Sequence, residues 1–127
     1  MTKYEKLLSE YDDNLIIEER KMVNDGLYSD GVVWLNKDLN SADKLSIVAE
    51  EIGHYETSSG DILDQTNISN VKQERNARKW AYEKVITLPE ILSAFRKGHK
   101  EIYDLAELFE VTEDFMRGCL KYYGFLE

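Results

Sequence analysis

Glu50, Glu51 and His54 have the spacing of a zinc-binding helix motif in which one residue is changed. In the HExxH motif of zinc peptidases, two histidines four residues apart lie on one face of a helix and bind one metal ion, while the glutamate after the first polarises a water molecule. Here Glu50 stands in place of the first histidine, and a carboxylate oxygen is also an acceptable zinc ligand. The spacing therefore indicates a candidate metal site with Glu50 and His54 as ligands.

A catalytic zinc ion needs a third protein ligand and an open position for water. Glu74, on the next long helical segment, is the candidate third ligand. Glu51 would then take the proton from the activated water as it attacks a peptide carbonyl polarised by the metal. Two carboxylates and one imidazole offset more of the ion's charge than two imidazoles and one carboxylate, so we expect weaker activity or a different metal preference.

The same residues can also be explained without a metal ion. The chain has 25 acidic residues, so two adjacent glutamates on a helix are ordinary. Asp61 and Asp64 are further oxygen donors, but aspartates in loops often cap turns instead. Tyr55 could stabilise an oxyanion beside His54, although the helical wheel favours a place in the core. The motif by itself leaves metal binding open.

Residues 42–55 are predicted to form the helix that carries the motif, with Ser41 as its N-cap. The apolar residues on one side form the expected core stripe: Leu45, Val48, Ala49, Ile52 and Tyr55. Glu50 and His54 fall on the other side, next to Ile47. Because a fully solvated face would rarely carry Ile47, we expect this helix to be covered on two sides, with its polar residues facing a cleft.

A second long helix is predicted over residues 71–88, ending at Pro89, which is the only proline. Glu74 shares one stripe of it with Ala77, Ala81, Val85 and Leu88. The small alanines would let this helix approach another backbone closely. That arrangement suits a glutamate that reaches into the face of a neighbouring helix.

The remaining segments predict an α+β fold that is mostly helical. Residues 27–28 and 32–35 are rich in β-branched and aromatic side chains and are punctuated by glycine turns, which favours a small antiparallel sheet. Residues 15–17 fit a strand or an irregular segment. The polar residues 57–69 are typical of a loop, and the apolar Ile62 and Leu63 are expected to anchor the middle of this loop to the protein. Helices are predicted over residues 2–11, 90–95, 102–109 and 113–122, the last with Thr112 as N-cap.

No repeat or low-complexity linker divides the chain, so we expect a single domain over residues 1–127. Residues 1–89 would form its core and residues 90–127 a helical C-terminal subregion. Residues 104–122 are spaced like a helix-turn-helix, but Glu113 and Asp114 would repel phosphates at a DNA groove. The formal net charge of −9 also argues against nucleic acid and anionic membranes as partners. We therefore expect this subregion to pack or to contact another protein.

A cytoplasmic location is expected for the protein. Cys119 is the only cysteine and cannot form an internal disulfide, which favours a reducing compartment. The helical pattern places it in the core rather than at a reactive surface. The sequence has neither the features of a signal peptide nor an apolar run long enough to cross a membrane.

With these residues, the chain resembles the ImmA/IrrE family of zinc metallopeptidases, especially its short forms from phages and mobile elements of Gram-positive bacteria. Residues 25–28 and 32–36 look like the family's small sheet, and residues 41–54 look like its active-site helix. Residues 74–81, followed by Pro89, match its third-ligand helix. The resemblance implies a zincin-like core, Zn²⁺ as cofactor, Glu51 as general base, and Glu50, His54 and Glu74 as metal ligands.

The resemblance also implies a partner. Members of the family cleave, or relieve repression by, a helix-turn-helix repressor encoded beside them. The first hypothesis is therefore an intracellular zinc-dependent endopeptidase that acts on a repressor-like protein. The alternative is the same fold without productive metal, working as an anti-repressor by binding alone. A DNA-binding regulator ranks third because of the acidic charge.

Overall fold

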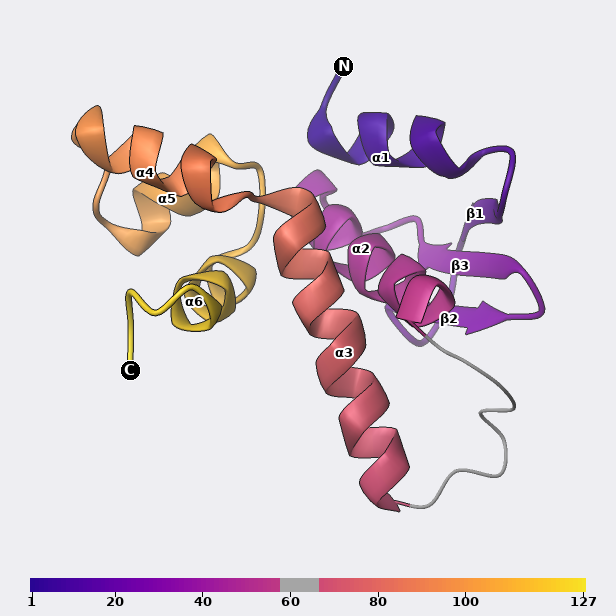
Figure 1. Ribbon diagram of the computed structural model, residues 1–127. Helices are drawn as coiled ribbons and strands as arrows, with labels where there is room; N and C mark the ends of the chain where they lie inside the picture. The colour runs from indigo at the N-terminus through magenta and orange to yellow at the C-terminus, as the bar shows by residue number, and fades with distance from the viewer. Residues whose placement is uncertain (58–66) are drawn as a thin grey trace.

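The computed structural model describes the backbone of residues 1–57 and 67–127, and the side chains of residues 1–57 and 71–127 (Figure 1). In chain order the elements are α1 (Lys3–Tyr11), β1 (Ile16–Arg20), β2 (Gly26–Ser29), β3 (Val32–Asn36), α2 (Ser41–Thr57), α3 (Asn67–Val85), α4 (Leu88–Arg96), α5 (Ile102–Leu108) and α6 (Glu113–Tyr122). The predicted α+β, mostly helical fold is confirmed. Asp61, Ile62, Leu63 and Asp64 lie outside the described residues.

The sheet is small and mixed, with the strand order β1-β3-β2. Strands β2 and β3 form the predicted antiparallel hairpin. Asp30 and Gly31 connect them, and both have positive φ, as tight hairpin turns require. Strand β1 lies in the segment expected to be a strand or irregular, and it pairs with β3 in parallel, so the sheet as a whole is mixed. An apolar strand pattern does not determine the direction of the strand beside it, which depends on where the preceding helix delivers the chain.

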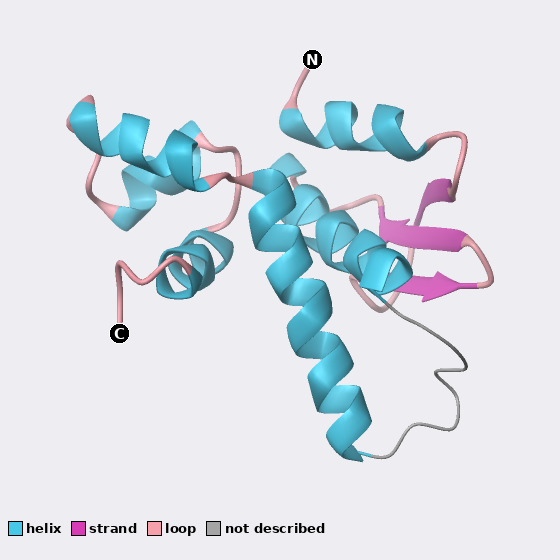
Figure 2. Ribbon diagram, in the orientation of Figure 1, coloured by secondary structure: helices cyan, strands magenta, loops and turns pink. Residues whose placement is uncertain are grey.

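Helix α2 is the central element, because it packs on both β2 and β3 and also on α1 and α3. Figure 2 shows the sheet and α3 with α2 between them. Leu45, Val48 and Ile52 of α2 are fully buried together with Val33 and Leu35 of β3. The expected cover on two sides of this helix is therefore confirmed.

The start of α2 differs from the prediction by one residue. Asn40 caps it, since the Asp43 N–H donates to Asn40 Oδ1 over 2.9 Å, whereas Ser41 is already the first helical residue. Both types are good N-caps, and only the backbone conformation decides between adjacent candidates.

The end of α3 was also placed wrongly. This helix begins at Asn67, within the segment predicted as a loop, and ends at Val85 rather than Leu88, which is exposed. Pro89 stands in the first turn of α4, where the missing N–H of proline costs nothing. Thr87 caps α4 with Glu90 in a reciprocal capping box. The proline therefore starts a helix instead of ending one.

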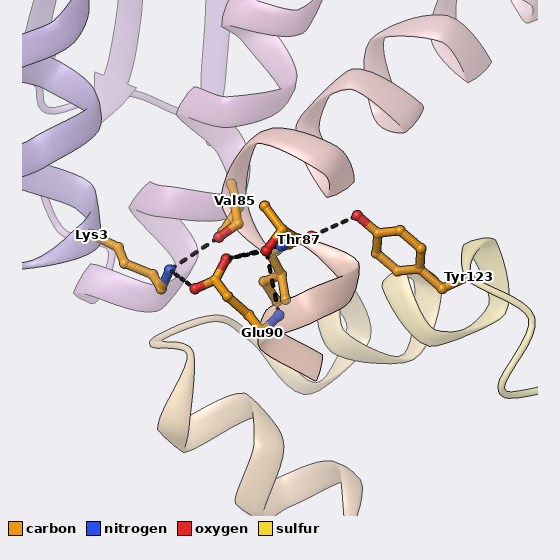
Figure 3. Close-up of polar contacts among 6 residues, drawn as sticks. Lys3, Val85, Thr87, Glu90 and Tyr123 are labelled. Carbon is orange, nitrogen blue, oxygen red and sulfur yellow. Dashed lines mark hydrogen bonds and ion pairs between the residues drawn. The ribbon is translucent and has the colours of Figure 1, made fainter. Parts of the chain in front are cut away.

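The connection between α3 and α4 is held by side chains from the start of the chain and from the residue after α6 (Figure 3). Lys3 Nζ donates to the backbone oxygen of Val85 over 3.1 Å and lies 3.4 Å from the Glu90 carboxylate. From the other side, the Tyr123 hydroxyl donates to the Ile86 oxygen over 2.7 Å. These contacts tie the C-terminal helices to the N-terminus of the chain.

Helix α6 has the predicted bounds and the predicted cap, because the Phe115 N–H donates to Thr112 Oγ1 over 3.0 Å. It buries Phe115, Met116, Cys119 and Leu120. Among the described residues, no helix is long and apolar enough to cross a membrane.

Burial makes Cys119 chemically inert in the folded protein. Its side chain is fully buried, and this burial raises the pKa of the thiol to about 12. Because the thiolate is the reactive form, a disulfide reagent at pH 8 should modify native protein at least about 100-fold more slowly than protein unfolded in guanidinium. Stopped-flow absorbance of the released thiolate measures both rates. Equal rates would show that α6 opens readily.

Candidate metal centre

Helix α2 presents Glu50 and His54 one turn apart on the face that turns away from its buried stripe. Ala49 and Ile52, on the buried stripe, are fully buried. The Glu50 side chain is 35% exposed and that of His54 17% exposed. Both side chains are therefore partly screened from solvent and still reachable from it.

The close crossing of α2 and α3 depends on two small residues. Gly53 of α2 lies against the backbone of Ala77 of α3, so that a Cβ added at Gly53 would overlap the Ala77 carbonyl oxygen. Ala77 and Ala81 are buried along this crossing. The predicted close approach of the alanine stripe to another backbone is thus confirmed.

This crossing brings Glu74 of α3 to the two residues of α2. Glu50, His54 and Glu74 each offer one ligand atom, and these atoms all lie within 4.8 Å of one another. His54 Nε2 is 3.0 Å from Glu74 Oε1. The Glu74 side chain is 52% exposed, but its carboxylate turns towards the histidine.

The three side chains fit a divalent cation. Zinc bonds to nitrogen and oxygen are about 2.0–2.2 Å long, so ligands of one tetrahedral ion are separated by roughly 3–4 Å. The observed separations need only small side-chain movements to reach that range. One imidazole nitrogen and two carboxylate oxygens are also donors that zinc accepts.

Glu51 lies beside this cluster in a partly buried position. Burial, followed by the negative charges of Glu50 and Glu74, raises the pKa of the Glu51 carboxyl above its ordinary value, while His54 acts in the opposite direction. A carboxylate with a raised pKa is a better proton acceptor near neutral pH. The chemistry available here is proton transfer next to a cation-binding cluster.

Arg78 is a site residue that the sequence analysis missed. One of its guanidinium nitrogens lies 3.6 Å from Glu50 Oε1. The available signal was its position four residues after Glu74, which places both on one face of α3. A cation at that position faces whatever Glu74 faces.

A cavity of about 220 Å³ adjoins Glu50 and extends towards the C-terminal helices. It is lined by Ser46, Glu50, Arg78, Ala81, Tyr82, Thr112, Asp114 and Phe115. The last three belong to the start of α6 and its cap. The C-terminal subregion therefore forms one wall of the space beside the cluster.

Two other side chains that could do chemistry have contacts outside the cluster. Tyr55 is partly buried and packs edge-on against Tyr28, with ring centroids 6.4 Å apart, in keeping with a core role. His99 Nδ1 lies 2.6 Å from Asp104 Oδ2 in the C-terminal helices, so this histidine is paired rather than free.

Comparison with known families agrees with this geometry. The Peptidase_M78 family model, described as the IrrE N-terminal-like domain, matches residues 9–120, which include both helices of the cluster. Comparisons with curated proteins and with solved structures give no match. Because the matched region covers most of the sequence and contains the residues that carried the resemblance, the chain belongs to the ImmA/IrrE family of metallopeptidases.

Proposed function

We propose that this chain is a zinc-dependent endopeptidase in which Glu50, His54 and Glu74 bind the metal ion and Glu51 is the general base. The observation that carries the proposal is the convergence of three ligand atoms from two helices to within 4.8 Å. Membership of a metallopeptidase family supports the same chemistry.

A bound zinc ion would supply the positive charge that polarises a peptide carbonyl and a water molecule. Glu51 would accept a proton from that water during its attack on the carbonyl carbon and pass the proton to the departing amine. His54 and the two carboxylates would hold the ion on α2 and α3, so that the rigid crossing of these helices orients it. Burial around Glu51 would limit competing solvent and keep its pKa raised.

The proposed substrate is a helix-turn-helix repressor, as the family resemblance implies. Charge supports a partner of this kind, because the chain has a net charge of −9 and DNA-binding proteins carry basic surfaces. The cavity beside Glu50 offers room for a side chain of the bound substrate.

A second candidate function is anti-repression by binding alone. It is favoured by one observation, namely that the polar side chains of the cluster have partners without a metal ion. His54 pairs with Glu74, and Glu50 pairs with Arg78. A protein in which these pairs persist would bind a repressor without cleaving it.

Loss of Glu74 tests the proposed metal site. We expect Glu74→Gln to lower the zinc affinity by more than about 100-fold, because losing a ligand should exceed the 10- to 100-fold cost of losing a group that only orients one. Isothermal titration with zinc alone measures this. Glu83→Gln, a matched change on an exposed residue of the same helix, should leave the affinity within about twofold. Equal affinities for the two variants would remove Glu74 from the site.

A further inference from the structure

The Glu50–Arg78 pair spans the same helix crossing that forms the proposed metal site. Arg78 belongs to α3 and Glu50 to α2, and the 3.6 Å that separates their charged atoms is longer than a hydrogen bond. The two side chains are 53% and 35% exposed, so solvent screens the pair. Such a contact is electrostatic, and breaking it costs little free energy.

The pair also balances the charge that distinguishes this ligand set. A histidine at position 50 would be neutral as a ligand, whereas Glu50 adds a third carboxylate to those of Glu51 and Glu74. The guanidinium of Arg78 offsets that addition. The three ligands and Arg78 together carry the same net charge as two neutral imidazoles and one carboxylate.

Arg78 has no competing acidic partner in the part of the chain that is described. Asp114 also lines the cavity beside Glu50, but its carboxylate pairs with Arg117 at 3.2 Å. Glu74, although one turn away on the same helix, turns to His54. The guanidinium is therefore directed to the carboxylate that a metal ion would need.

We propose that Arg78 neutralises Glu50 and competes with the metal ion for its carboxylate. This inference rests on the proposed metal site. When the ion binds, Glu50 exchanges the guanidinium for the cation, and Arg78 is released towards the cavity. The pair thereby lowers the metal affinity of the chain.

The test is a double-variant comparison with zinc as the only ligand. Arg78→Gln should bind zinc about twofold to fivefold more tightly than the parent protein, the range expected for losing a solvent-exposed ion pair. Arg75→Gln removes the same charge from an exposed position on the same helix and controls for general repulsion of the cation. In a Glu50→His background, Arg78→Gln should change the affinity no more than Arg75→Gln does, because Arg78 then has no carboxylate to hold. Chelator competition measures the zinc affinity of the parent and of each variant, and thermal unfolding without metal confirms that the variants are folded.

Each outcome decides the inference. A gain of about twofold to fivefold in Arg78→Gln that Arg75→Gln does not reproduce, and that is lost in the Glu50→His background, would support the inference. Weaker or unchanged binding by Arg78→Gln, or an equal gain in the Glu50→His background, would overturn the inference and leave the metal site intact. If neither the parent nor any variant binds zinc, the proposed function and the inference both fail.

Discussion

Replacing Glu51 with glutamine should lower peptide hydrolysis by at least about 100-fold while zinc remains bound. General acid–base catalysis typically contributes about 10²- to 10⁴-fold to a rate, and an amide cannot accept the proton. Glu51 is not one of the three converging ligand groups, so the zinc affinity should stay within about twofold. Cleavage of a helix-turn-helix repressor, the proposed substrate, is followed by gel electrophoresis and mass spectrometry and gives the first measurement. Isothermal titration gives the second.

The fold should survive this substitution. Burial disfavours the charged form of Glu51 and raises its pKa, so a neutral amide in the same place should not reduce the free energy of unfolding at pH 7. A thermal melt provides this control. If Glu51→Gln relieves repression as well as the parent protein does and neither cleaves the repressor, binding is the mechanism and the peptidase proposal is wrong.

Gly53→Ala should disrupt the site through the backbone rather than through a ligand. The new methyl group would overlap the Ala77 carbonyl oxygen and lie 3.1 Å from Ala77 Cα, and backbone atoms cannot rotate away. The two helices must therefore separate, at a cost of about 1–3 kcal/mol of stability even after the better helix propensity of alanine. Glu74, one turn before Ala77, moves with α3, so zinc affinity should fall by at least about tenfold. Denaturant unfolding and zinc titration measure the two effects.

Gly118→Ala is the matched control. It is also a glycine inside a helix, α6, but its added methyl group would meet the hydroxyl end of the Tyr82 side chain. A flexible side chain can move aside, so this variant should lose less stability than Gly53→Ala and should keep its zinc affinity. Equal losses in both variants would mean that the α2–α3 crossing tolerates a methyl group and does not limit the site.

The sequence determined the local features of this protein. The buried stripe of α2, with Glu50 and His54 on the opposite face, follows from helical periodicity alone. Thr112 and the bounds of α6 follow from capping preferences. Glu74 could be selected because the alanines after it on one helix face predicted close packing against a neighbour.

Other features depended on tertiary contacts. The parallel pairing of β1 with β3 and the place of Pro89 in the first turn of α4 depend on the positions of other elements in the fold. The Glu50–Arg78 pair joins two helices: the spacing from Glu74 indicates the face of α3 on which Arg78 lies, but not its partner on α2. Periodicity and capping act within a few residues, so they determine which face of a helix is polar. Which partner that face meets is decided by the crossing of α2 and α3, where Gly53 and Ala77 allow the backbones to come close enough for three ligand groups to converge.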